Sequence, residues 1–143
     1  MYRDKLTAEE AYIHSEEGYR NKPYRCTSGK LTIGIGWNLD EGIAWEDAVM
    51  MFRSQLQRIR SSLSRRLPWF ADLEEARQAA LVSMAFQMGV TGLMGFKNTL
   101  KLIERGDYEG AGKAMLDSRW AKQTPTRAQR TAYMMRYGQF PTT

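Results

Sequence analysis

The chain has 143 residues, of which 43% are hydrophobic, and its formal net charge is +5. This length and composition predict one domain, 1–143, with its own core, and they exclude a disordered chain or a membrane protein. One cysteine and one histidine exclude a disulfide framework and a structural zinc site, so no metal or cofactor is expected.

The first eighteen residues carry polar or charged side chains every few positions, without the apolar run of a signal peptide or membrane anchor. We therefore expect no transmembrane segment and a protein held in the cytoplasm. Thr7 and Glu10 have the T-x-x-E spacing of a capping box, which predicts a helix that runs to Glu17 and ends at Gly18. The helix dipole disfavours a carboxylate in the last turn, so stability alone does not explain Glu17.

Two short β-compatible runs follow, at 24–26 and 31–35, and residues 27–30 between them have the composition of a turn. The sequence therefore predicts a hairpin. Gly34 and Gly36 weaken its second strand and permit the close approach of a ligand or of another backbone.

The remaining chain is predicted to be helical. An apolar stripe at helical spacing predicts a long helix from residue 46 to Pro68, with its stripe in the core: Val49, Phe52, Leu56, Ile59 and Leu63. Residues 73–88 are mostly apolar, with small and large residues on all faces, and predict a buried central helix that Gly89 ends. Further helices are expected at 93–105, 108–117 and 125–137.

Three reactive side chains surround the predicted hairpin. A glutamate at a helix end is ordinarily just exposed, but Cys26 follows Glu17 by nine residues and Thr32 follows Cys26 by six, so the hairpin can bring both toward Glu17. A partly desolvated acid, a polarising group and a hydroxyl that positions water are the parts needed to hydrolyse a glycosidic bond.

Three blocks of sequence, in order between about residues 6 and 138, resemble the phage lysozymes (endolysins) typified by the T-even coliphage enzyme. The first block holds Glu17-Gly18, Tyr24, Cys26 and Thr32-Ile33-Gly34-Ile35-Gly36. The second holds Phe86-Gln87-Met88-Gly89, Thr91-Gly92, Gly95-Phe96 and Asn98, and the third holds Ser118-Arg119-Trp120, Gln123-Thr124-Pro125 and Arg127.

The resemblance implies a mainly α, α+β fold of the two-lobed lysozyme type. It implies a small β lobe at about 18–43 and a helical lobe at about 1–17 and 44–143, with a peptidoglycan cleft between them. By the same resemblance, Glu17 is the general acid, Thr32 positions the attacking water, and Cys26 stands where most relatives have aspartate.

The resemblance also assigns the supporting residues. Gln87, Gly36 and Trp37 are expected to bind substrate, although the type enzyme has histidine in place of Trp37, and Arg127 is expected to pair with Glu17. A thiol, whose ordinary pKa is about 8.5, carries the negative charge of an aspartate only when its pKa is lowered. Whether Cys26 acts as a thiolate, a nucleophile or a water-positioning group stays open, as does retention or inversion.

The function implied is an endolysin that cleaves the β-1,4 bond between N-acetylmuramic acid and N-acetylglucosamine, causing host cell lysis and phage release. It is expected to be a monomer in the host cytoplasm that reaches the wall after a holin has permeabilised the inner membrane, and to bind no specific nucleic acid. The alternatives are a lytic transglycosylase and a basic, non-enzymatic module that binds nucleic acid or membrane through Arg58, Arg60, Arg65 and Arg66.

Overall fold

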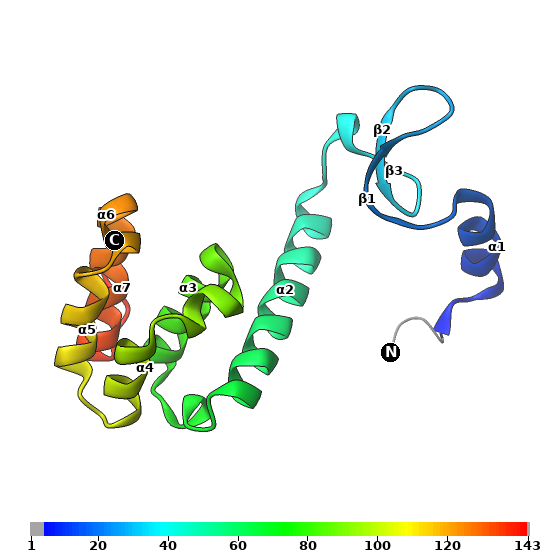
Figure 1. Cartoon of the computed structure of the whole chain (residues 1–143). Coiled ribbons are helices and arrows are strands. Elements are labelled where there is room, and N and C mark those ends of the chain that lie inside the picture. Colours follow the sequence, from blue (N-terminus) through cyan, green and yellow to red (C-terminus); the bar gives the residue numbers. More distant parts are fainter. Residues whose placement is uncertain (1–4, 143) are drawn as a thin grey trace. The chain divides into compact units, whose positions relative to one another are not determined.

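A computed structural model describes residues 5–142 of the chain (Figure 1). The chain divides into two compact units, one ending at Met50 and the other beginning at Met51, and each is described by itself. Helices predominate, and one small antiparallel sheet accompanies them, so the predicted mainly α, α+β class is confirmed. The predicted lobe boundaries, with residues 1–17 in the helical lobe, stay a prediction.

The first helix, α1 (Ala8–Glu17), begins and ends as its sequence predicts. The Glu10 amide donates a hydrogen bond to Thr7 Oγ1 (3.1 Å), and the Thr7 amide donates one to Glu10 Oε2 (2.8 Å). These two bonds form the capping box. Gly18 follows with a φ of 70°, which turns the chain away from the helix immediately after Glu17.

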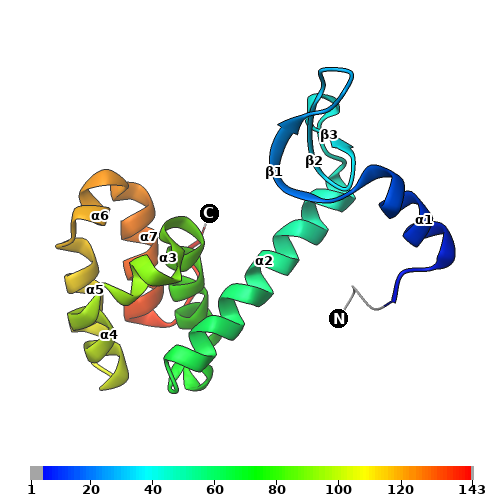
Figure 2. The same ribbon diagram turned by 45° about the vertical axis from the view of Figure 1, so that its right-hand side comes forward.

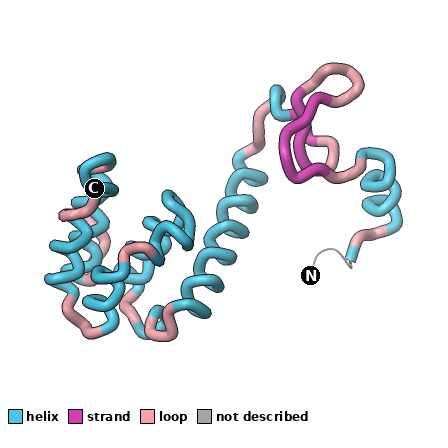
Figure 3. The backbone as a smooth tube through the Cα atoms, viewed as in Figure 1, coloured by secondary structure: helices cyan, strands magenta, loops and turns pink. Residues whose placement is uncertain are grey.

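The sheet of the first unit has three antiparallel strands in the order β1 (Arg20–Arg25), β2 (Leu31–Gly34) and β3 (Trp37–Asn38) (Figure 3). The predicted hairpin of β1 and β2 is confirmed. The two-residue strand β3 was not predicted. Thr32 lies opposite Tyr24 on one side and Asn38 on the other, so it occupies the central strand. A short 3-10 helix, η2 (Leu39–Glu41), leads toward α2 (Trp45–Arg66).

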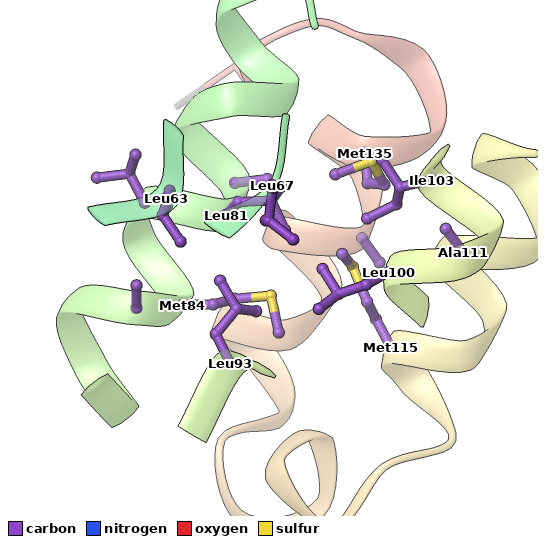
Figure 4. Close-up of a cluster of buried hydrophobic side chains, with 14 of the residues drawn as sticks. Leu63, Leu67, Leu81, Met84, Leu93, Leu100, Ile103, Ala111, Met115 and Met135 are labelled. Atoms are coloured by element: carbon purple, nitrogen blue, oxygen red, sulfur yellow. The ribbon is translucent and has the colours of Figure 1, made fainter. Parts of the chain in front are cut away.

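The second unit contains most of α2 and five further helices that pack on one another (Figure 2). They are α3 (Glu75–Met94), α4 (Lys97–Glu104), α5 (Tyr108–Leu116), α6 (Arg119–Gln123) and α7 (Pro125–Tyr137), with the 3-10 helix η3 (Phe70–Asp72) before them. Contacts join α5 to α4, α6 and α7, and α7 to α3 and α6. Side chains from α2 to α5 and from α7 converge on the core, where Leu63, Leu81, Met84 and Met115 are fully buried (Figure 4).

The central helix carries the clearest signature of burial. Ala80, Leu81, Met84 and Ala85 of α3 are at most 2% exposed, as the apolar composition of this segment predicts. Gly89 has a φ of 83° and interrupts the helix, and a short helical piece then continues to Met94. The predicted end at Gly89 is therefore confirmed as a break in α3.

Two predictions about the helices are corrected, and one helix is an addition. The stripe on α2 is buried at its C-terminal end, at Leu63, whereas Phe52 is 48% exposed and packs edge to face on Phe86, with ring centroids 5.8 Å apart. The fourth helix starts at Lys97 and not at residue 93, because Phe96 leaves the helix and packs against Trp120. The short helix α6, which Ser118 caps, was not predicted.

Within residues 5–142, no single helix is long and apolar enough to cross a membrane. Taken together, α3 and α4 have the length and apolar composition of a membrane span, but the two helices meet at a bend of 99°. Most of the α3 side chains that make it apolar belong to the hydrophobic core.

Candidate functional site

Glu17 is the last residue of α1, and its carboxyl group lies against Gly36 in the turn between β2 and β3. A methyl group at Gly36 would lie 2.9 Å from Glu17 Cδ and 3.2 Å from Cγ, closer than carbon atoms ordinarily approach. The missing side chain of Gly36 therefore makes room for the carboxyl group. Glu17 is exposed, so the partial desolvation that the sequence predicted is not provided by the residues around it in the first unit.

Cys26 lies at the start of the turn that joins β1 to β2. Its amide donates a hydrogen bond to the Lys30 carbonyl (3.0 Å), and its carbonyl accepts one from the Gly29 amide (2.8 Å). The sulfur lies 3.1 Å from Ser28 Oγ, and the residue is partly exposed. The turn thus fixes the backbone of Cys26 and leaves the thiol accessible.

The surroundings of Cys26 favour its ionised form. They lower the pKa of the thiol from 9.0 to about 7, chiefly through the Ser28 hydroxyl and then through the backbone N–H groups of Ser28 and Lys30. Partial burial opposes this lowering, and Thr32 adds the smallest contribution. The thiolate is therefore a substantially populated form of Cys26 at neutral pH. A lowered pKa is what a cysteine needs in order to carry the negative charge of an aspartate in the same place.

Thr32 is 5% exposed at the centre of the sheet. Its hydroxyl donates a hydrogen bond to the Lys30 carbonyl (2.9 Å), the same carbonyl that accepts from the Cys26 amide. Thr32 and Cys26 are therefore held by one turn. Because the hydroxyl proton is used within the turn, the Thr32 oxygen is left as an acceptor.

The first unit thus brings together two pairs of predicted residues, Cys26 with Thr32 and Glu17 with Gly36. Within residues 5–142, no hydrogen bond joins the Glu17 carboxylate to Cys26 or to Thr32. Trp37 is half-buried in β3, where its indole N–H donates to the Gly42 carbonyl (3.1 Å). That bond fixes the ring of the residue that directly follows Gly36 in the chain.

The second unit holds the other predicted residues in defined orientations. The buried Trp120 donates its indole N–H to Gln87 Oε1 (2.8 Å), so the Gln87 amide group keeps both of its N–H donors. The Arg127 guanidinium donates to the carbonyl oxygen of Ser83 (3.0 Å) and to its hydroxyl (3.1 Å). The pairing of Arg127 with Glu17 stays a prediction.

Sequence reasoning missed three contacts that orient the predicted residues: Ser28 on Cys26, Trp120 on Gln87 and Ser83 on Arg127. Ser28 and Trp120 were visible in the sequence only as a turn former and as part of a motif. A shallow groove along α2 contains none of the predicted site residues, and the part of the chain that the structure describes holds no cluster of side chains suited to a metal ion.

The chain matches the family described as phage lysozyme over residues 14–133. It is 33% identical to the pre-baseplate central spike protein Gp5 of Enterobacteria phage T4, over 88% of this chain and 27% of that protein. It is 28% identical to the probable T4-type lysozyme 1 of Dictyostelium discoideum, over 86% of this chain and 90% of that protein. It is also 28% identical to the endolysin of Acyrthosiphon pisum secondary endosymbiont phage 1, over 77% of this chain and 75% of that protein.

Proposed function

Because this chain belongs to the phage lysozyme family, we propose that it cleaves the β-1,4 bond between N-acetylmuramic acid and N-acetylglucosamine in peptidoglycan. The protein is a lysozyme, a glycoside hydrolase that acts on cell walls. The bond assignment is supported by two groups of the first unit. An exposed carboxyl group, that of Glu17, ends α1, and a thiol with a lowered pKa, that of Cys26, lies in the turn of the sheet that follows.

Glu17 is assigned the role of general acid. In the hydrolysis of a glycosidic bond, one carboxyl group donates a proton to the bridging oxygen as the bond breaks. Glu17 is exposed at the end of α1, and Gly36, which has no side chain, makes room for its carboxyl group beside the β2–β3 turn. The group is therefore free to meet a bound saccharide.

Cys26 is assigned the role of the base that acts on the attacking water. A thiolate accepts a proton from water while the sugar ring becomes cationic, and its negative charge stabilises that cation. Thr32 supports this step, because its oxygen accepts a hydrogen bond from the same water. Attack of that water on the face opposite Glu17 gives a product of inverted configuration.

The second unit contributes binding groups to this proposal. The free N–H donors of Gln87 suit a carbonyl or hydroxyl oxygen of the substrate, since Trp120 already occupies its oxygen atom. Arg127 is assigned to pair with Glu17, and Ser83 holds its guanidinium in place. Gly36 and Trp37 are assigned to the saccharide on the side of the sheet.

The proposed biological role is that of an endolysin. The protein would act as a monomer from the host cytoplasm, after a holin has opened the inner membrane, and would lyse the host and release phage. A second role is favoured by the similarity to the central spike protein, namely a lysozyme unit carried on the phage particle. Mass spectrometry of purified particles distinguishes the two, because a spike unit is present in the particle and an endolysin stays in the lysate.

Mass spectrometry of the muropeptides released from purified peptidoglycan tests the reaction. Hydrolysis gives reducing N-acetylmuramic acid ends, whereas a lytic transglycosylase gives anhydro ends that are lighter by one water. Anhydro ends as the main product would replace the proposed reaction by the transglycosylase. Proton NMR of the first products reads the anomeric configuration, and a retained configuration would make Cys26 a nucleophile in place of a base.

A further inference from the structure

We propose that Ser28 is a positioning residue of the reaction, whose hydroxyl donates a hydrogen bond to Cys26 and holds the sulfur as a thiolate. The proposal rests on the assignment of Cys26 to the reaction under the proposed function. Ser28 has no place among the residues that the family resemblance points to. Its role is inferred from one contact, in which Ser28 Oγ lies at a distance of 3.1 Å from Cys26 Sγ.

The turn fixes this contact. Two backbone hydrogen bonds close the turn between Cys26 and Lys30, and Gly29 adopts a φ of 82°, which lets the chain reverse within four residues. The side chains of residues 26 and 28 therefore face each other by backbone geometry. The contact between the sulfur and the Ser28 hydroxyl is therefore made within the turn itself.

Either atom can donate while the thiol is neutral, but only the Ser28 hydroxyl can donate to a thiolate, and that arrangement favours the charged form of the sulfur. A neutral thiol is a weak donor and a weak acceptor, whereas a thiolate accepts strongly from a hydroxyl. Ser28 makes the largest contribution to the lowered pKa of the thiol. Thr32 is the other hydroxyl nearby, but its proton is directed to the Lys30 carbonyl and its contribution to the lowered pKa is the smallest, so Ser28 is the main hydroxyl that acts on the sulfur.

Charged side chains do not replace this hydrogen bond. Arg25 and Lys30 flank the turn, and the Arg25 guanidinium donates to the Gly29 carbonyl (3.1 Å). Neither charge is among the causes that lower the pKa of Cys26, all of which are hydrogen bonds. Glu17, the carboxylate predicted to be reactive, makes no hydrogen bond to the thiol in the part of the chain that the structure describes.

A cysteine needs this support and an aspartate does not. An aspartate side chain is ionised at neutral pH without help, because its ordinary pKa is about 3.9. A cysteine in the same place is mostly neutral at pH 7 unless its neighbours acidify it. Ser28 therefore makes the thiol equivalent in charge to the aspartate of most relatives, and it should lose its importance when Cys26 itself becomes aspartate.

Alkylation of the thiol tests the proposal without any substrate. The chain has one cysteine, so the rate of reaction with iodoacetamide between about pH 5 and pH 10 reports the ionisation of Cys26 alone. We expect Ser28→Ala to slow alkylation at pH 7 by about fivefold and to approach the wild-type rate above pH 9. Ser28→Thr, which keeps the hydroxyl, should stay close to wild type.

Thr27→Ala is the matched control, since it removes the neighbouring hydroxyl of the same exposed turn and should leave the alkylation profile unchanged. An unchanged profile in Ser28→Ala would overturn the proposal. So would an equal shift in both variants, because it would report a disturbed turn and not a lost hydrogen bond.

Wall-lysing activity then separates this proposal from the proposed function. Ser28→Ala should lower activity at pH 7 by about the factor seen in alkylation, and much less in a Cys26→Asp background. An equal loss in both backgrounds would contradict the action of Ser28 through the thiol. If Cys26→Ala lyses walls like wild type, the assigned reaction of Cys26 fails, while the alkylation result still decides the contact between Ser28 and Cys26.

Discussion

Gly36→Ala should remove most of the wall-lysing activity while costing little more stability than the same change at Gly34. The two glycines have nearly equal backbone angles, with a φ of 71° at Gly36 and 68° at Gly34. They differ in what a new methyl group would meet. At Gly34 nothing lies within 4 Å, whereas at Gly36 the methyl group would collide with the Glu17 side chain.

The structure gives the size of both effects. An alanine with a positive φ of this kind costs about 1–2 kcal/mol, and this cost applies equally to both positions. At Gly36 the methyl carbon would lie 2.9 Å from Glu17 Cδ. Because carbon atoms ordinarily pack at about 3.5 Å or more, the carboxyl group must move by roughly 0.6 Å. Since a misplacement of about 1 Å costs up to about 100-fold in rate, we expect Gly36→Ala to lose about ten- to fiftyfold.

Turbidity loss of permeabilised Gram-negative cells measures the activity, and thermal unfolding followed by circular dichroism measures the stability. The two variants should unfold at similar temperatures, while Gly34→Ala should keep activity within about threefold of wild type. The rate should fall in kcat more than in KM, because the displaced group acts on the breaking bond. Equal losses of activity in the two variants would refute the reasoning, since the shared backbone strain would then explain both.

Three further changes test other parts of the structure. Glu17→Gln should lower the release of reducing sugars by about 10³-fold, with a change in the free energy of unfolding within about 0.5 kcal/mol, because an exposed amide at a helix end costs little; activity within tenfold of wild type would remove Glu17 from the mechanism. Cys26→Asp should keep substantial activity and should still lyse walls at about pH 5, where the wild-type thiol, with a pKa of about 7, is only about 1% ionised. Cys26→Ala should be slow at every pH, and peptidoglycan fragments should protect the wild type from inactivation by alkylation. Leu81→Ala, at a position that is 0% exposed, should lower the free energy of unfolding in urea by about 2–5 kcal/mol, and a smaller loss would show that the core closes around the cavity.

The elements that the sequence predicted well are those whose signals are local. The capping box at Thr7 begins α1 and Gly18 ends it through their own backbone angles and hydrogen bonds, so a few residues suffice. The mostly apolar composition of α3 similarly predicts its burial, because so many apolar side chains in one helix favour a position in the core. Such features do not depend on distant parts of the chain.

The elements that were missed depend on the partners that they meet in the fold. The two residues of β3 form a strand because β2 supplies hydrogen bonds, and the strand preference of Trp37 is too short a signal to predict it beside Asn38. The start of α4 is delayed because Phe96 packs on Trp120, which lies 24 residues later. Phe52 follows the apolar stripe of α2 and is still half exposed, since periodicity predicts a face and not the partner that covers it.

The candidate site shows the same division between residue types and contacts. The spacing of Glu17, Cys26 and Thr32 predicts which groups take part, because the reaction needs an acid, a base and a hydroxyl. The position and the charge state of these groups depend on neighbouring residues that the sequence does not mark as reactive. Gly36 leaves space for the Glu17 carboxyl group, and the Ser28 hydroxyl contacts the Cys26 sulfur. A thiol placed where relatives carry aspartate makes the second kind of residue decisive: a carboxylate is charged wherever water reaches it, while a thiolate at neutral pH exists only through the hydrogen bonds that the turn supplies.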